Sequence, residues 1–153
     1  ILGLLGRTKH RVTLIGDKSL SKRDFSRVIK PLQQFGINIK SRNNLLPLEI
    51  EGTDFLKPIK YDENIGSAQV KSCLILCALN TPGVTIIKSK KSRNHTELML
   101  KHLKYPIKIQ NGKFIDKILV RGQHQISAFN YCIFNHITYF KFFNNFYFIF
   151  FFI

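Results

Sequence analysis

Two short stretches of the chain, each placed where an extended apolar run gives way to helical periodicity, restrict the folds that it can adopt. The first, residues 16–23 (GDKSLSKR), follows the β-branched run 12–15, and the second, residues 67–72 (SAQVKS), follows a strand pattern at 58–61. A helix start leaves backbone N–H groups unpaired and carries the positive end of the helix dipole. Both stretches are therefore candidate anion sites, and together they favour a ligand with more than one anionic group.

The hydrophobic periodicity predicts an alternation of strands and helices. The predicted helices are 21–35, 67–79 and 92–103, and the predicted strands are 12–15, 37–40, 46–51, 58–61, 84–87, 107–109 and 118–120, the last two forming a hairpin around the turn at 111–112. The order strand, helix, strand, strand is then nearly repeated along the chain, which implies an internal repeat. We therefore predict an α+β fold of two-layer α/β sandwiches built from repeated units, rather than one doubly wound sheet.

Local signals set the expected ends of the helices. Ser21 and Asp24 form a plausible capping box for the first helix, and Gly36 is placed to end it. Ser67 is placed to cap the second helix, a role that needs no ligand.

The charge balance of the chain is strongly positive. Its 24 Lys and Arg residues against 9 Asp and Glu give a formal net charge of +15. Such a chain favours anionic partners, either nucleic acid or phosphorylated metabolites. The basic residues are spread along the chain from Arg7 onward without a dense block, an RNA-stacking motif or zinc-finger spacing, so nucleic acid is the weaker of the two candidates.

The three cysteines indicate neither a disulfide framework nor a metal site. Cys73 and Cys77 are spaced i, i+4 on an apolar helical face, and Cys132 stands alone. We expect core thiols in a reducing compartment.

The two ends of the chain differ from its middle. The chain begins at Ile1 and its only methionine is Met99, so we expect an internal fragment of a longer protein. Residues 132–153 are rich in phenylalanine, without a sensible alternation. A membrane helix is the competing interpretation, but only the last eight residues are free of polar interruptions, against about 20 needed for a span. We predict an aberrant tail that is not native to the fold.

Six motifs of the chain are informative because of their order. They are GDKSLSKR at 16–23, RV and PL at 27–28 and 31–32, LPL at 46–48, SAQVKS at 67–72, LNTPG at 79–83 and SRNHTE at 92–97. Each motif alone is weak, but six in order with plausible gaps, between about residues 11 and 131, form a specific signal. In this order they resemble the 5-enolpyruvylshikimate-3-phosphate synthase family.

The resemblance implies the two-domain enolpyruvyl transferase fold with its repeated βαβαββ-type units, of which residues 1–131 would be a fragment of a substrate-binding domain. The family transfers the enolpyruvyl group of phosphoenolpyruvate to the 5-hydroxyl of shikimate 3-phosphate, on the pathway to chorismate and the aromatic amino acids. It needs no metal or organic cofactor. The resemblance further implies small-molecule partners, a cytoplasmic monomer, and neither nucleic acid nor membrane as a partner.

The same resemblance assigns substrate-binding residues. Arg23 would hold phosphoenolpyruvate, since a guanidinium fork can bind a carboxylate or phosphate at two points. The Ser67 hydroxyl and the Ala68 backbone N–H would bind the phosphate of shikimate 3-phosphate. Gln69 would reach both substrates through its amide, and Arg93 would contact shikimate 3-phosphate.

Two positions depart from the family pattern. Asp24 follows Arg23 where the family usually has proline, which puts a carboxylate beside the proposed anion site and could weaken the grip of the arginine. Asn94 replaces the usual aspartate after Arg93. Other basic residues are expected to supply only a general positive field, namely Lys18, Lys22, Arg27 and Lys71.

No catalytic residue is assigned within the chain. The lysine near the start of the family's sequences and its Asn-Ala-Gly-Thr loop would both precede Ile1. Residues 132–135 stand where the family's catalytic aspartate is expected, in a Pro-Gly-Asp-x-Ser-Ser run. We therefore expect the fragment alone to have no turnover.

Three alternatives remain open from the sequence. One is the related enolpyruvyl transferase that acts on a UDP-amino sugar, whose Gly-Gly-Cys loop has no counterpart before Arg23. Another is a basic nucleic-acid-binding module, which the charge permits. The third is a non-functional remnant of the synthase.

Overall fold

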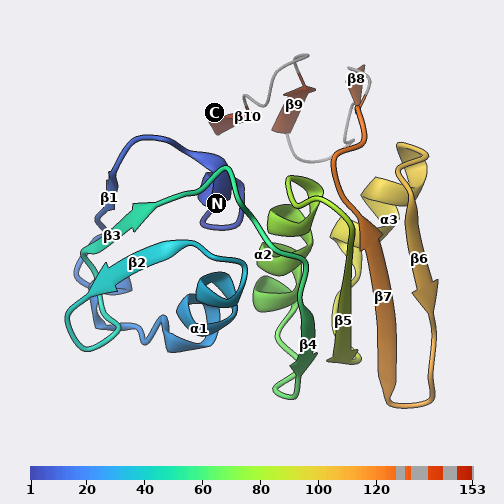
Figure 1. The fold of residues 1–153 in the computed structure, drawn as a ribbon, viewed down its shortest axis with the longest axis horizontal. Helices are drawn as coiled ribbons and strands as arrows, with labels where there is room; N and C mark the ends of the chain where they lie inside the picture. Colours follow the sequence, from blue (N-terminus) through green and yellow to red (C-terminus); the bar gives the residue numbers. More distant parts are fainter. Residues whose placement is uncertain (127–129, 132–137, 143–147, 153) are drawn as a thin grey trace.

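Strands and helices alternate along the chain and assemble into two neighbouring units that share the helix α2 (Figure 1). The computed structural model describes residues 1–126, 130–131, 138–142 and 148–152. The helices are η1 (Leu4–Arg7), η2 (Leu20–Lys22), α1 (Ser26–Gln34), α2 (Ala68–Leu79) and α3 (His95–His102). The strands are β1 (Val12–Leu14), β2 (Asn38–Ser41), β3 (Leu48–Glu51), β4 (Lys60–Glu63), β5 (Val84–Lys90), β6 (Ile107–Gln110), β7 (Ile115–Arg121), β8 (Asn130–Tyr131), β9 (Thr138–Phe142) and β10 (Phe148–Phe152).

The two units have different sheets. The first has an antiparallel sheet in the order β1-β3-β2, with α1 between β1 and β2. The second has the order β4-β5-β7-β6, in which β4 and β5 are parallel and the other pairs antiparallel. Its element order, β4-α2-β5-α3-β6-β7, is the βαβαββ arrangement. The predicted α+β class and the predicted hairpin at 107–120 are confirmed.

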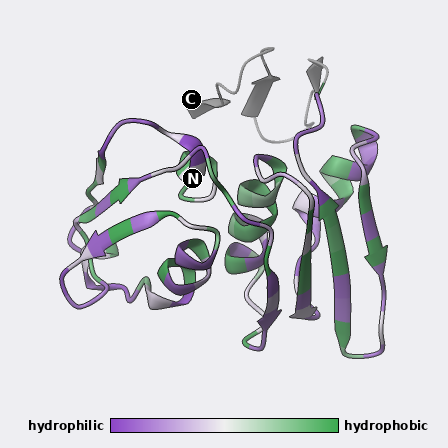
Figure 2. Ribbon diagram, in the orientation of Figure 1, coloured by the Kyte–Doolittle hydropathy of each residue, from purple (hydrophilic) through white to green (hydrophobic). Residues whose placement is uncertain are grey.

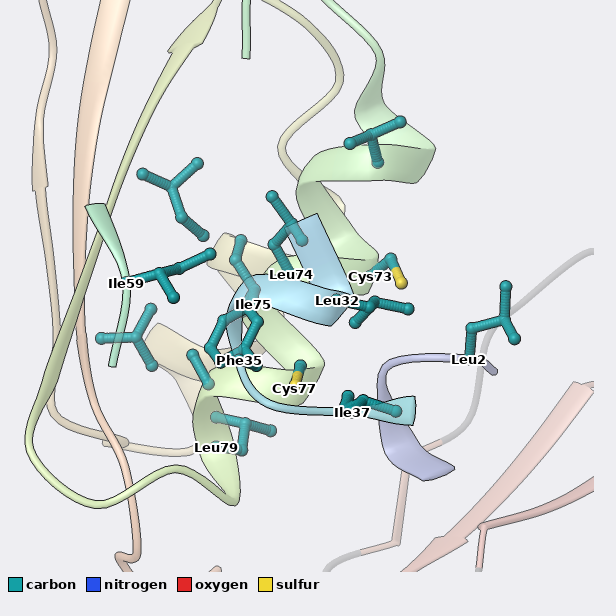
Figure 3. Close-up of a cluster of buried hydrophobic side chains, with 14 of the residues drawn as sticks. Leu2, Leu32, Phe35, Ile37, Ile59, Cys73, Leu74, Ile75, Cys77 and Leu79 are labelled. Carbon is teal, nitrogen blue, oxygen red and sulfur yellow. The ribbon is translucent and has the colours of Figure 1, made fainter. Parts of the chain in front are cut away.

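The helix α2 forms the centre of the core. Hydrophobic residues run along most of its length in Figure 2, and its buried side chains point in most directions around the axis, except on the side that carries Gln69, Ser72 and Leu76. α2 contacts α1 and η1 of one unit and β5 and β7 of the other, so it is buried beyond the single apolar face on which Cys73 and Cys77 were expected. Figure 3 shows Leu32 and Phe35 gathered with Leu74 and Ile75, all of them almost fully buried.

The first predicted helix begins later than the sequence pattern indicated. Residues 20–22 form a separate 3-10 turn, and α1 starts only at Ser26. The predicted capping box is wrong, because the Ser21 hydroxyl donates to the carbonyl of Gly16 instead. Asp24 accepts hydrogen bonds from the backbone N–H and the hydroxyl of Ser26, at 2.7 and 2.8 Å. Its short carboxylate therefore caps α1 two residues before the helix.

The prediction of core thiols is confirmed for the two cysteines of α2. Cys73 and Cys77 are buried and free. Burial raises the pKa of the Cys73 thiol to about 11 and raises that of Cys77 as well, so both stay protonated at neutral pH. Cys132 lies outside the described residues.

The Phe-rich end of the chain contributes strands where it is described. β8, β9 and β10 form a separate antiparallel sheet with the order β10-β9-β8. Within the described part of the chain, no helix has the length and hydropathy needed to cross a bilayer. The boundary at residue 131 and the non-native character of 132–153 stay predictions.

A buried carboxylate fixes the loop that leads into α2. Glu63, at the end of β4, is 3% exposed. It accepts hydrogen bonds from the backbone N–H groups of Ile65 (3.1 Å) and Gly66 (2.8 Å) and from the hydroxyl of Ser89 (3.1 Å). Gly66 adopts a φ of +80°, a conformation that side chains disfavour. The loop is thereby attached to β5, and the first turn of α2 takes its position from that attachment.

The burial of Leu74 in the core predicts that truncating its side chain lowers the stability of the protein. Leu74→Ala removes a fully buried side chain between the two units and should lower the free energy of unfolding by about 2 to 5 kcal/mol. Leu98→Ala, the same change at an exposed helical position, should cost under about 0.5 kcal/mol. Urea denaturation of both variants measures the difference, and equal losses would contradict the central place of α2.

The Glu63 network makes a second prediction. Glu63→Gln keeps the shape of the side chain but turns one of its acceptors into a donor, which then faces a backbone N–H. We expect a loss of about 1 to 3 kcal/mol in stability and faster hydrogen exchange at the Gly66 amide. Glu49→Gln, on the exposed face of β3, is the matched control. Unchanged exchange at Gly66 would show that the carboxylate does not hold the loop.

Candidate functional site

The ends of two neighbouring strands bring two helix starts together. β4 and β5 are parallel and adjacent, so their carboxyl ends lie at one edge of the sheet. α2 follows β4 and α3 follows β5, and both helices therefore begin at this edge (Figure 1). The motifs SAQVKS and SRNHTE, separate in the sequence, thus belong to one region of the surface.

The first turn of α2 offers several hydrogen-bond donors. Ser67 has an extended backbone and its hydroxyl oxygen accepts from the N–H of Val70 at 3.4 Å, as predicted for an N-cap. Because the oxygen accepts in that bond, the hydroxyl proton remains available to an anion. The N–H groups of Ala68 and Gln69 precede the first intrahelical bond, which joins the N–H of Lys71 to the carbonyl of Ser67.

Arg23 and Gln69, predicted from different motifs to bind substrates, line the same cavity. The cavity has a volume of about 280 Å³ and lies among β1, β3, α1 and the start of α2. Its polar lining comes from Arg23, Asp24, Arg27 and Gln69, and the remaining lining residues are Ile1, Leu2, Leu14, Ile15, Leu20, Phe25, Val28, Leu46, Leu48, Val70 and Cys73. Arg23 is exposed and forms no ion pair within the described part of the chain.

Asp24 is engaged with the backbone rather than with Arg23. The hydrogen bonds from the backbone N–H and hydroxyl of Ser26 hold the pKa of its carboxyl below the usual value. The carboxylate is therefore ionised at neutral pH and already occupied as a cap. The pairing with Arg23 that the sequence suggested is not formed, and the guanidinium of Arg23 stays available.

Arg93 stands apart from this cavity. It lies two residues before α3, is exposed, and is not among the residues that line the cavity of Arg23 and Gln69. Two contacts connect its helix to α2. The hydroxyls of Ser72 and Thr96 are 2.8 Å apart, and the Lys71 ammonium is 2.7 Å from a carboxylate oxygen of Glu97.

The structure changes the interpretation of two other basic residues. Lys71 was expected to add to a positive field, but its side chain is 2% exposed and its charge is paired with Glu97. Arg27 was given the same general role, and the structure places it on the cavity beside Arg23. A lone lysine inside an apolar helical run was a signal for a buried partner. Nothing in the sequence singled out Arg27.

The side chains around the candidate site favour anions rather than a metal ion. In the ranges that the structure describes, no three or more His, Cys, Asp or Glu side chains are grouped so that they could hold a metal ion. The arrangement instead offers two guanidinium groups, an amide and a helix start, which are groups that bind carboxylates and phosphates.

The chain is similar to known proteins of one family. The chain is 45% identical over 130 residues to 3-phosphoshikimate 1-carboxyvinyltransferase of Ruthia magnifica subsp. Calyptogena magnifica, an alignment that covers 84% of the chain and 29% of that protein. The chain is also 41% identical over 133 residues to the protein of the same name from Streptococcus mutans, and this alignment covers 85% of the chain and 30% of the relative. The chain thus spans under a third of the length of these curated relatives.

The fold is also that of a solved structure. EPSP synthase from Acinetobacter baumannii superimposes with a TM-score of 0.72 at 34% sequence identity, over 82% of this chain and 28% of that one. The sequence model of EPSP synthase (3-phosphoshikimate 1-carboxyvinyltransferase) matches residues 1–143. The chain therefore belongs to the EPSP synthase family.

Proposed function

We propose that the chain supplies part of the substrate site of a 3-phosphoshikimate 1-carboxyvinyltransferase, which transfers the enolpyruvyl group of phosphoenolpyruvate to the 5-hydroxyl of shikimate 3-phosphate. The observation that carries the proposal is the cavity shared by Arg23 and Gln69, next to the open start of α2. Both substrates are small polyanions, and unpaired guanidinium groups beside a helix start are suited to them.

Shikimate 3-phosphate binds at the first turn of α2 in this proposal. The Ser67 hydroxyl and the Ala68 N–H donate to its phosphate, and the positive end of the helix dipole adds to the attraction. The short side chains of Ser67 and Ala68 leave room for a phosphate to approach the backbone. Arg93 reaches the same substrate from the start of α3.

Phosphoenolpyruvate binds in the cavity. Arg23 holds its carboxylate or phosphate with the two-pronged geometry of the guanidinium group, and Arg27 lies on the same cavity. The Gln69 amide has both a donor and an acceptor, so it can contact both substrates from its place between them. Asp24 remains bound to Ser26 and leaves the cations free.

The reaction is an addition followed by an elimination. A base takes the proton of the 5-hydroxyl as its oxygen bonds to the central carbon of phosphoenolpyruvate, and an acid protonates the methylene carbon; phosphate and a proton then leave. The residues of this chain hold the phosphates and stabilise developing negative charge. No residue of the chain is assigned to proton transfer. The chain acts in the cytoplasm and as a monomer in this proposal.

Substitutions at the cavity test the proposal. Arg23→Gln should weaken phosphoenolpyruvate binding about 10-fold to 100-fold, because a charged hydrogen bond is lost. Arg121→Gln removes the same charge at the far end of β7, opposite the start of β5, and should change the affinity less than about twofold. Calorimetric titration measures both, with Ser67→Ala as the corresponding change for shikimate 3-phosphate. Salt-dependent binding to any DNA, with no response to either metabolite, would favour a nucleic-acid-binding module instead.

Turnover gives a separate test. The carboxylate on the cavity, Asp24, has a lowered pKa and accepts two hydrogen bonds, which makes it a poor base. We expect the chain, mixed with both substrates, to release no phosphate above background in a coupled phosphate assay. Release that scales with protein concentration and disappears in Arg23→Gln would contradict this expectation.

A further inference from the structure

We propose that the buried ion pair between Lys71 and Glu97 positions the start of α3 against the start of α2, so that Arg93 and Ser67 address one polyanionic ligand. The pair joins the two helices at 2.7 Å, with the two side chains 2% and 3% exposed. This role deepens the proposed function and rests on it, because it assigns positioning residues to the same site. Neither residue of the pair touches the ligand.

Stability does not explain the pair. Two charges lose their hydration when they are buried, and replacing such a pair with apolar side chains of similar volume is often neutral or stabilising. The pair is also incompletely satisfied, since the second carboxylate oxygen of Glu97 is buried and has no hydrogen-bond partner among the described residues. An ion pair that costs desolvation but fixes geometry fits a positioning role.

The packing of the two helices shows why they need such a contact. α2 packs on α1, η1, β5 and β7, whereas α3 packs on β6. The two helices thus rest chiefly on different elements, and the ion pair links their starts directly. Ser72 follows Lys71 on α2 and Thr96 precedes Glu97 on α3, so the Ser72–Thr96 hydrogen bond lies next to the ion pair. Two adjacent contacts restrain the rotation of the helices as well as their separation.

The contacts are close in sequence to the ligand-binding positions. Lys71 is on the same first turns of α2 as Gln69, and Glu97 is one helical turn after Arg93. Arg93 is exposed, has no ion pair in the described chain and precedes α3 by two residues, so its position follows that of the start of α3. Loosening that start should reduce the binding of shikimate 3-phosphate, which contacts both helices, more than that of phosphoenolpyruvate.

The test replaces both charges at once. In Lys71→Met with Glu97→Met, the pair becomes apolar and of similar volume. We expect the affinity for shikimate 3-phosphate to fall at least 10-fold and that for phosphoenolpyruvate to change less than threefold. The Leu98 amide, which bonds to the carbonyl of Asn94 at 3.0 Å, should exchange at least 10-fold faster. The Ile87 amide in β5 should be unaffected.

An exposed ion pair is the matched control. Lys88 and Asp62 are 3.8 Å apart with side chains 55% and 62% exposed, and Lys88→Met with Asp62→Met removes the same two charges. This variant should keep wild-type affinities and wild-type exchange at Leu98. Ser72→Ala with Thr96→Val removes the neighbouring hydrogen bond without changing charge and should give a smaller effect in the same direction. If the variant without the buried ion pair does not fold, the variant without the Ser72–Thr96 hydrogen bond tests the positioning role in its place.

The outcomes separate the two proposals. Wild-type exchange at Leu98 in a folded variant without the buried pair would overturn the positioning role, as would equal losses of affinity for both substrates. A wild-type chain that binds neither substrate would refute the proposed function, while the exchange comparison would still test the coupling of the two helix starts.

Discussion

The burial of α2 around most of its circumference is the constraint on which the rest of the structure depends. Leu74, Ile75 and Cys77 are fully buried, and the side of the helix that carries Gln69, Ser72 and Leu76 is partly exposed, so both units cover the rest of α2. With α2 covered in this way, its polar first turn lies at the carboxyl ends of β4 and β5. The same packing sets α1 and the loop of Arg23 against the first turn of α2, which creates the cavity.

The charged groups of the candidate site, in the cavity and at the two helix starts, divide into two sets. Glu63, Asp24 and Lys71 have partners within the protein, and each fixes a loop end or a helix start. Arg23 and Arg93 have no ion pair within the described residues. The first set holds the site in place without pairing with the second set, so the charges of the second set stay available to ligands. This division supports a site for anionic ligands better than the net charge of +15 does.

Local sequence signals predicted much of the fold. The strand near residue 12, the cap at Ser67 and the hairpin of β6 and β7 follow from short-range patterns, and all are confirmed. The later start of α1 was missed because Asp24 satisfies Ser26 instead of pairing with Ser21. The role of Lys71 was missed because its partner lies on another helix, and no local pattern encodes such a contact. The family resemblance, rather than periodicity, selected Arg23, Ser67, Ala68, Gln69 and Arg93 from many similar residues.

In the proposed function, the start of α2 binds the phosphate of shikimate 3-phosphate. The most direct test is a titration of the isotopically labelled chain with shikimate 3-phosphate, followed by the chemical shifts of its backbone amides. We expect the Ala68 and Gln69 amides to move most and to saturate together, while inorganic phosphate at the same concentration has a smaller effect. No response at these amides, or shifts confined to the lysines of the outer sheet face such as Lys88, would contradict the claim.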